Sequence, residues 1–296
     1  MSNIATFITS KKLSNFFMEL KAGLYIVATP IGNLDDITLR ALFVLKHSDI
    51  IYCEDTRATQ KLLQKHDISD KKLAIYNDHS NEKERQKIAG LIKEGKVICL
   101  VSDAGTPLIS DPGFKLSRYL QDQNLHIDAL PGACAAIAAL TLSGLGSDKF
   151  FFAGFMPRTE HGRNKILKSL EDISATIIFY EGPSRILDSL IAIEKTLGNR
   201  EVVVAREITK IFQTVVRKPV SEIIANFNEI KLKGEFVLLV SSEKAEINLT
   251  EEQVMKLIQE LKNKGMTAKN IAEELTRRFN KKITKNEIYK MCRIGE

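Results

Sequence analysis

Short apolar runs alternate with helix-like segments through the first half of the chain. Five of these runs are bounded by turn residues and predict buried strands at residues 24–29, 49–53, 73–76, 97–102 and 126–130. The segments between and after them predict helices at residues 38–47, 56–65, 80–94, 112–123 and 133–145. Such alternation, with continuously apolar strands, is typical of a parallel sheet that helices cover on both faces.

The pattern changes after residue 150. Apolar runs predict strands at residues 150–155, 176–180, 202–206, 211–216 and 236–241, with helices expected at 183–197 and 222–227. A short connection joins the runs 202–206 and 211–216, which predicts an antiparallel pair. We therefore expect a second α/β domain with a mixed sheet.

The last fifty residues predict three helices. Thr250 and Gln253 fit a capping box at the start of the first helix, and Gly265 ends it. Helices near 268–279 and 283–293 follow, in a helix-turn-helix-like outline. The expected fold is therefore α/β, with two α/β domains and a small all-α module. The expected parts are a disordered N-terminal extension at 1–22, domains at 23–146 and 147–242, and the helical module at 250–296.

Charge is concentrated in that helical module. The chain holds 43 basic and 37 acidic residues, for a net charge of +6. Residues 262–293 alone carry 10 basic and 3 acidic residues, so the rest of the chain is close to neutral. A polyanionic partner is therefore expected at the C-terminal module.

The cysteine and histidine patterns favour no metal site and no disulfide framework. None of the four cysteines forms a CxxC pair, and the five histidines show no metal-ligand spacing. Reduced thiols indicate a cytoplasmic protein. No apolar stretch reaches the roughly 18–20 residues that a membrane span needs, so we expect no membrane association.

Candidate chemistry gathers in the loops after the predicted strands, where open parallel sheets bind ligands. Three of these loops are rich in Gly and Pro, namely loop one (28–34), loop two (102–113) and loop three (130–135). None contains a GxGxxG or a Walker motif. Loop two carries Asp103 and Asp111 and no basic residue, which suits a ligand with an ammonium or sulfonium charge, such as S-adenosylmethionine.

At these residues the chain resembles the tetrapyrrole methylase superfamily of S-adenosylmethionine-dependent enzymes. The matching stretches are LYIVATPIGNLDDITLRAL (24–42), EDTR (54–57), VSDAGTPLISDPG (101–113), LPGACAAIAAL (130–140), FAGFMPR (152–158), FYEGPSRI (179–186), AREITK (205–210) and KGEFVLLV (233–240). The long SDAGTP loop is similar to that of the branch that methylates RNA, whereas the porphyrin and corrin methylases have a shorter loop.

The resemblance implies an enzyme that binds S-adenosylmethionine between two α/β domains, usually as a homodimer. It implies methylation of the ribose 2′-hydroxyl of a cytidine in small-subunit ribosomal RNA, either as free RNA or in the assembled small ribosomal subunit. Two alternatives stay open. One is a methylase of a tetrapyrrole or corrin, and the other is a helix-turn-helix nucleic-acid binder whose α/β part only senses a ligand.

The candidate site residues fall into three groups. For cofactor binding we predict Pro30, Asp103, Gly105, Thr106, Ile109 and Ala133 of the loops, with Phe179, Tyr180, Phe236 and Val237 around the adenine. For catalysis the candidates are Glu54, Asp55, Arg57, Glu181, Arg206, Glu207 and Lys210, because charge at a strand end is costly unless it is paired or used. For RNA binding they are Arg158, Arg163, Lys165, Lys168, Lys269, Arg277, Arg278, Lys281, Lys282, Lys285, Lys290 and Arg293.

Overall fold

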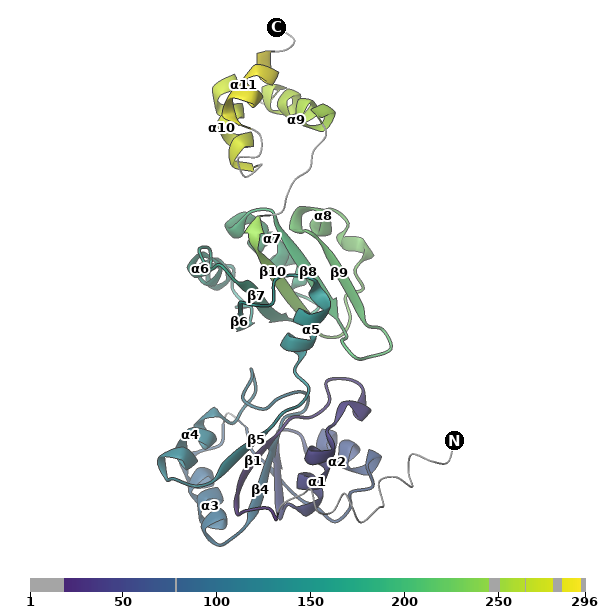
Figure 1. The fold of residues 1–296 in the computed structure, drawn as a ribbon, viewed down its shortest axis with the longest axis vertical. Coiled ribbons are helices and arrows are strands. Elements are labelled where there is room, and N and C mark those ends of the chain that lie inside the picture. The colour runs from purple at the N-terminus through teal and green to yellow at the C-terminus, as the bar shows by residue number, and fades with distance from the viewer. Residues whose placement is uncertain (1–18, 78, 245–250, 264, 279–283, 294–296) are drawn as a thin grey trace. The chain divides into compact units, whose positions relative to one another are not determined.

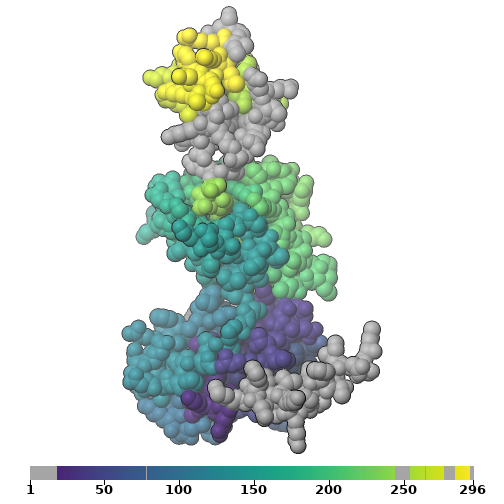
Figure 2. Space-filling model, in the orientation of Figure 1, coloured from purple at the N-terminus to yellow at the C-terminus, as the bar shows by residue number. Residues whose placement is uncertain are grey.

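The computed structural model describes residues 19–77, 79–244, 251–263, 265–278 and 284–293, and the remaining residues are grey in Figures 1 and 2. Most of the predicted N-terminal extension lies outside the described residues. So do residues 245–250, which include the predicted capping residue Thr250, and residues 279–283 before the third C-terminal helix. Among the helices that are described, none is long and apolar enough to cross a membrane.

The chain divides into two compact units. The first comprises Met1–Leu142 together with Ala205–Thr214, and the second comprises Ser143–Val204 together with Val215–Glu296. The segment Ala205–Thr214 therefore belongs with the first unit, although it is distant from the rest of that unit along the chain.

The first unit contains a five-stranded parallel sheet with the strand order β3-β2-β4-β1-β5 (Figure 1). The strands are β1 Gly23–Val27, β2 Ile50–Cys53, β3 Lys72–Ile75, β4 Val97–Val101 and β5 Ile127–Leu130. Every residue of β1, β2 and β4 is buried. Central strands buried on both faces have no polar face, which is why these runs are continuously apolar.

Helices cover both faces of this sheet. They are α1 Leu39–His47, α2 Thr56–Lys65, α3 Glu82–Lys93, α4 Phe114–Asp122 and α5 Ala135–Ser143, and a short 3-10 helix η1 spans Leu34–Asp36. Tyr25 and Val27 of β1 pack in one core with residues of α1 and α2, whereas Leu24 and Ile26 pack in another with residues of α3 and α4. Alternate side chains of β1 therefore pack into two separate cores, one on each face of the sheet.

Side-chain caps fix where several of these helices begin. The Thr38 hydroxyl accepts a hydrogen bond from the Ala41 amide at the start of α1, at 3.1 Å. The Asn81 side chain accepts from the Glu84 amide in the same way at the start of α3. Each cap satisfies an amide that the first helical turn leaves unpaired.

The second unit contains a mixed five-stranded sheet with the order β6-β7-β10-β8-β9. Its strands are β6 Phe150–Phe155, β7 Thr176–Glu181, β8 Arg200–Arg206, β9 Thr214–Pro219 and β10 Phe236–Lys244. β6 is parallel to β7, and β7 is antiparallel to β10, as a mixed sheet requires. The helices beside this sheet are α6 Glu160–Ser169, α7 Ile186–Leu197, α8 Val220–Ala225 and the 3-10 helix η2 Phe227–Glu229.

One predicted strand begins later than expected. The prediction placed a strand over 211–216, but β9 begins only at Thr214. A turn hydrogen bond from the Gln213 amide to the Lys210 carbonyl, and a left-handed backbone at Thr209 with φ of 67°, keep the preceding residues in a loop. The turn closed by this hydrogen bond contains Ile211 and Phe212, so they cannot belong to the strand, whatever the apolar pattern indicates.

The three C-terminal helices form a small bundle with its own core. They are α9 Glu251–Asn263, α10 Ala268–Arg278 and α11 Lys285–Arg293. Ile258, Ile271 and Ile288, one from each helix, are buried together. Gly265, with φ of 79°, follows α9 in the left-handed conformation that glycine adopts without strain.

Candidate functional site

Hydrogen bonds join the three Gly- and Pro-rich loops of the first unit. Thr29 and Gly105 exchange two backbone hydrogen bonds of 2.9 and 3.0 Å, which tie loop one to loop two. The Thr29 hydroxyl also donates to the Ser102 carbonyl at 3.1 Å. The Thr106 hydroxyl donates to the Ala133 carbonyl at 2.9 Å and ties loop two to loop three. Loops that come from separate strand ends therefore form one connected assembly.

The path of loop two depends on unusual backbone conformations. Gly105 and Gly113 have φ of 87° and 130°, and Leu108 and Ser110 have φ of 74° and 65°. A Cβ at Gly113 would lie 2.7 Å from side-chain atoms of both Leu100 and Leu108. Non-glycine residues in the left-handed region persist only where their surroundings impose that conformation, and such strain clusters at functional sites.

Acidic groups concentrate beside this loop. The side chain of Asp103 is exposed, and its Oδ1 accepts a hydrogen bond of 3.0 Å from the Asp55 amide. Asp55 caps α2 through the Arg57 amide and forms an ion pair of 2.6 Å with the Arg57 guanidinium. The side-chain hydrogen bonds from Arg57 lower the pKa of Asp55 to about 2. Arg57 neutralises Asp55, so it is the exposed Asp103 carboxylate that favours a positively charged ligand at this edge of the sheet.

The segment between β8 and β9 contributes to the same unit. This β8–β9 loop, Glu207–Gln213, contacts loop one through a hydrogen bond of 3.0 Å from the Asn33 amide to the Thr209 hydroxyl. A Cβ at Gly32 would lie only 2.5 Å from Cγ of Lys210 and 2.6 Å from Oγ1 of Thr209. Glycine is thus required at position 32 because the β8–β9 loop packs directly against it.

Two of the predicted catalytic residues form an ion pair on this loop. Nζ of Lys210 lies 2.8 Å from Oε1 of Glu207, and both side chains are partly exposed. Arg206, in contrast, is buried, and its guanidinium donates to the Phe212 carbonyl at 3.0 Å and to the Thr214 hydroxyl at 3.3 Å. Arg206 therefore positions the loop, and the neighbouring Glu207 and Lys210 are the ones with exposed polar atoms.

In the second unit, Glu181 lies at the centre of a buried network. Its side chain is fully buried, pairs with Arg185 at 2.6 Å and accepts a hydrogen bond of 2.5 Å from the Ser189 hydroxyl. Its Oε1 also accepts from the Gly182 amide at 2.8 Å. Arg185 in turn donates to the Met156 carbonyl at 3.2 Å. The network fixes the loops that follow β6 and β7, so the contacts of Glu181 are those of a positioning residue.

Most of the residues predicted to surround the adenine are buried in the second sheet. Phe179 and Phe236 are 0% and 2% exposed and pack in the core between this sheet and its helices. Val237 is buried as well. Only Tyr180 is partly exposed, and its ring makes edge contacts with the rings of Phe152 and Phe155.

The predicted RNA-binding residues differ in their accessibility. Arg158, Lys165 and Lys269 are exposed, whereas Arg163 is buried and donates to the Arg158 carbonyl at 2.8 Å. Burial of this guanidinium does not suit a direct phosphate contact. The side chains of Arg277 and Arg278, and all of Lys281 and Lys282, lie outside the described residues. The remaining candidates, Lys168, Lys285, Lys290 and Arg293, are exposed.

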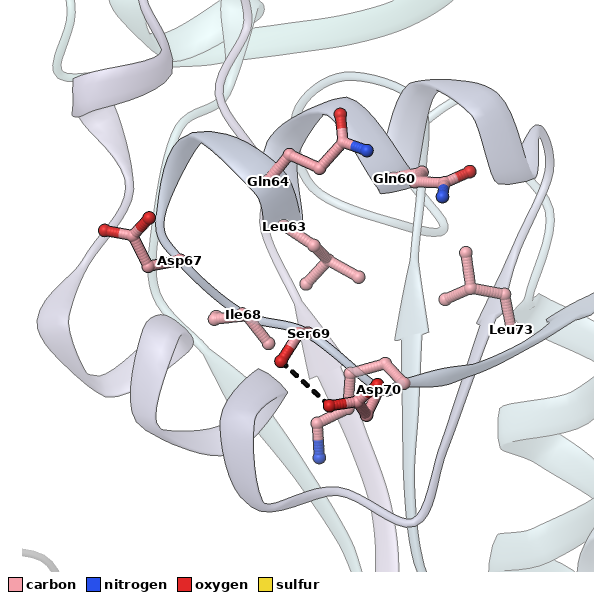
Figure 3. Close-up of a pocket in the computed structure, with 9 residues that line it drawn as sticks. Gln60, Leu63, Gln64, Asp67, Ile68, Ser69, Asp70 and Leu73 are labelled. Carbon is pink, nitrogen blue, oxygen red and sulfur yellow. Dashed lines mark hydrogen bonds between the residues drawn. The ribbon is translucent and has the colours of Figure 1, made fainter.

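Two open pockets among the described residues border α2. One, of about 550 Å³, is lined by Asp55 and Arg57. The other, of about 600 Å³, lies beside Leu63, Ile68 and Leu73, between the end of α2 and the start of β3 (Figure 3). It sits at the amino end of a strand, opposite the edge where open parallel sheets bind ligands. A small cavity of about 40 Å³ lies behind loops one and two, against Pro30 and Asp103. Its volume is close to that of a single water molecule.

Sequence reasoning missed two structural contributors. Arg185 lies inside the stretch FYEGPSRI (179–186), but its role as the ion-pair partner of the buried Glu181 is visible only in the structure. Ile211 and Phe212 were assigned to a strand, whereas they are 95% and 67% exposed in the β8–β9 loop. Arg185 lies only four residues after Glu181, so the sequence shows the spacing of this pair but not its burial, and the exposure of Ile211 and Phe212 depends on the backbone conformation of their loop.

Comparison with known proteins agrees with this arrangement. The family model of the tetrapyrrole (corrin/porphyrin) methylases matches residues 23–224. A ribosomal RNA small subunit methyltransferase I from Rickettsia prowazekii (strain Madrid E) is 48% identical over 272 residues, which cover 92% of this chain and 96% of the relative. The protein of the same name from Bacillus subtilis (strain 168) is 40% identical, covering 90% of this chain and 92% of its own.

Solved structures share the fold at low sequence identity. A cobalt precorrin-4 methyltransferase superposes with a TM-score of 0.56 and 18% identity, covering 74% of this chain and 95% of its own. A diphthine synthase gives a TM-score of 0.59 at 15% identity, covering 74% and 89%. The sequence motifs, the presence of two α/β sheets and these similarities agree, and the chain belongs to the tetrapyrrole (corrin/porphyrin) methylase family.

Proposed function

We propose that this chain transfers the methyl group of S-adenosylmethionine to the ribose 2′-hydroxyl of a cytidine in small-subunit ribosomal RNA. The observation that carries the proposal is the similarity, at 40% to 48% identity over nine-tenths of the chain, to relatives named ribosomal RNA small subunit methyltransferase I. The cytidine and its 2′-hydroxyl are the finer part of the proposal and rest on the resemblance of the long SDAGTP loop.

The connected loops of the first unit fit a ligand with a sulfonium charge. Asp103 presents an exposed carboxylate, and loop two holds no lysine or arginine that would repel a cation. Backbone groups around Gly105, Thr106 and Ala133 can hold the rest of the ligand, with Pro30 and Ile109 beside them. Bound there, S-adenosylmethionine supplies an electrophilic methyl group.

The β8–β9 loop supplies the charged groups for the ribose hydroxyl. The Lys210 ammonium stabilises negative charge that develops on the 2′-oxygen, and Glu207 beside it accepts the proton. General acid–base assistance of this kind contributes about 10²–10⁴-fold to a rate. Orientation of the hydroxyl in line with the methyl group is the larger contribution.

Basic surface residues hold the RNA backbone. Arg158 and Lys165 of the second unit and Lys269 of α10 are exposed. Each contact between such a residue and a phosphate makes the affinity for RNA fall more steeply as the salt concentration rises.

The substrate also places the reaction in the cytoplasm, where ribosomal subunits are assembled. We further propose a homodimer, on the resemblance alone. The corrin and porphyrin methylases among the solved structures carry the fold only, so a tetrapyrrole substrate has no specific observation in its favour.

The test is direct methylation of small ribosomal subunits. Subunits from a strain that lacks the corresponding methyltransferase are incubated with the protein and S-adenosylmethionine labelled in its methyl group. We expect label on one cytidine, mapped as a 2′-O-methyl group by resistance of the adjacent linkage to alkali. Cofactor binding without any transfer to RNA would overturn the proposal, and label on a base would overturn the 2′-hydroxyl assignment. Free ribosomal RNA as a parallel substrate separates recognition of RNA from recognition of the assembled subunit.

A further inference from the structure

The tip of the β8–β9 loop exposes two adjacent large apolar side chains. Ile211 is 95% exposed and Phe212 is 67% exposed, more than most apolar side chains in the described part of the chain. Isolated exposed apolar residues are common on protein surfaces. Two neighbours at the tip of a single loop, one of them aromatic, call for a specific explanation because both remain in water.

This exposure does not come from a loosely held loop. The buried Arg206 donates to the Phe212 carbonyl at 3.0 Å, and the Thr209 amide donates to Oε1 of Gln213 at 2.7 Å. In addition, the backbones of Glu207 and Thr209 hold left-handed φ angles of 52° and 67°. Such conformations persist only where surrounding contacts impose them. The backbone is therefore fixed in a shape that keeps Phe212 out of the core.

The same loop is anchored to the proposed site. The Thr209 hydroxyl accepts from the Asn33 amide of loop one at 3.0 Å, and Lys210 packs against Gly32. The tip therefore lies on the same compact unit as the three connected loops. Within the loop the charges of Glu207 and Lys210 are paired with each other, and residues 211–216 carry no charge, so no acidic side chain of the tip itself repels a phosphate backbone.

We propose that the ring of Phe212, supported by Ile211, is a platform on which an unpaired base of the RNA substrate stacks. The inference rests on the proposed function. It names a contact with the substrate that the proposed function does not itself include. A ribose 2′-hydroxyl can enter a protein site only from an accessible strand, and unpaired bases are recognised by stacking on aromatic side chains. Stacking accepts any base, so Phe212 orients the strand, whereas sequence is read elsewhere.

The experiment compares F212A, F212L and F212W with the unaltered chain and with I191A. Ile191 is 45% exposed on α7 in the second unit, so I191A removes exposed apolar surface without touching the loop. Steady-state methylation of small subunits gives KM and kcat, and calorimetry gives the affinity for S-adenosylhomocysteine. We expect F212A and F212L to raise KM for the subunit by roughly 10-fold or more, since stacking losses are of this order. F212W and I191A should stay within about threefold of the unaltered chain, and cofactor affinity should be unchanged in all variants.

A photo-crosslinking amino acid at position 212 identifies the occupant. Crosslinks to ribosomal RNA near the methylated cytidine support the proposal. Crosslinks to a ribosomal protein or to a second copy of this chain overturn it, as does equal activity of F212A and F212W. If the unaltered chain transfers no methyl group to RNA, the proposed function itself fails. If it does transfer one and F212A behaves like I191A, only the stacking inference fails.

Discussion

The two sheets of this molecule differ in how the acidic residues at their strand ends are partnered. In the parallel sheet of the first unit, Asp103 stays exposed, with only one carboxylate oxygen in a hydrogen bond to a backbone amide. In the mixed sheet of the second unit, Glu181 is fully buried, and Arg185, Ser189 and a backbone amide satisfy it. Both residues follow or end an apolar strand, yet one is available to a ligand and the other holds two loops together. A charge at a strand end is therefore a site candidate only when its partners leave part of it unsatisfied.

The largest expected effect comes from breaking the buried network of the second unit. E181A leaves Arg185 without its buried partner, and removal of one member of such a pair costs about 3–5 kcal/mol. Urea unfolding of E181A should therefore show a large loss in the free energy of unfolding. The matched control is E160A, since Glu160 pairs with Lys195 across 3.7 Å on the surface, and we expect a change within about 0.5 kcal/mol. An E181A protein of unaltered stability that has lost methyl transfer would instead make Glu181 a catalytic residue.

The next effect comes from moving the β8–β9 loop away from loop one. In G32A the added methyl group would overlap Lys210 and Thr209, so the loop must shift. Misplacement of catalytic groups by about 1 Å can cost roughly 100-fold in rate, so we expect a loss of this order in kcat with cofactor affinity kept. The control is G90A on α3, where a Cβ meets nothing within 4 Å and alanine favours the helix. A G32A enzyme with normal kcat would show that the contact between the two loops is not needed for transfer.

A smaller effect tests the exposed carboxylate of the first unit. D103N keeps the oxygen that accepts from the Asp55 amide and removes only the charge. We expect the Kd for S-adenosylmethionine to rise about 10-fold, equivalent to about 1.4 kcal/mol, with little change in stability. D122N, on a surface residue that pairs with Arg118, should leave the Kd unchanged. Calorimetry with S-adenosylhomocysteine, whose thioether sulfur is uncharged, should show a smaller difference between the two variants, because the sulfonium charge is then absent. Equal cofactor affinity in D103N and D122N would remove Asp103 from the site.

The last effect, absent at neutral pH, is a dependence of stability on alkaline pH. Burial raises the pKa of the Cys99 thiol to about 12, above its ordinary value of 9.0. Between these two pH values the unfolded chain has lost a proton that the folded chain keeps, so stability falls as pH rises. For one titrating group, the free energy of unfolding falls by up to about 1.4 kcal/mol per pH unit. C99A should flatten this part of the curve, measured by urea unfolding from pH 8 to 11, and a slope identical to that of the unaltered chain would contradict the assignment.

Local pattern was sufficient for much of the fold. The five strands and five helices of the first unit lie within a few residues of their predicted ranges, because the central strands β1, β2 and β4 are apolar along their whole length and caps such as Thr38 mark the helix starts. The predicted fold class, the family and its S-adenosylmethionine-dependent methyl transfer are confirmed by the family match and the relatives. The domain boundaries and the individual site residues stay predictions.

The candidate site was predictable only in part. Loops one to three were identifiable because Gly, Pro and Asp gather after strands of a parallel sheet. The role of Arg206 was not, because a strand alternates its side chains between two faces and the pattern does not say which face is covered. The positions of Phe179 and Phe236 were ambiguous for the same reason, since an aromatic residue in an apolar strand suits a core and a binding site equally.

The sequence by itself determined the order of strands and helices, the strand-end loops and the acidic character of loop two, because these follow from hydrophobic periodicity and residue type over short distances. Only the tertiary structure decided which charges are satisfied. Thr209 contacts Asn33 across 176 positions of the chain, and the Arg185 that pairs with Glu181 also donates to the Met156 carbonyl 29 positions away, and no local pattern encodes these contacts. The free energy of a charge or a polar group depends on its partners and its exposure to water, and both are set when distant segments pack together.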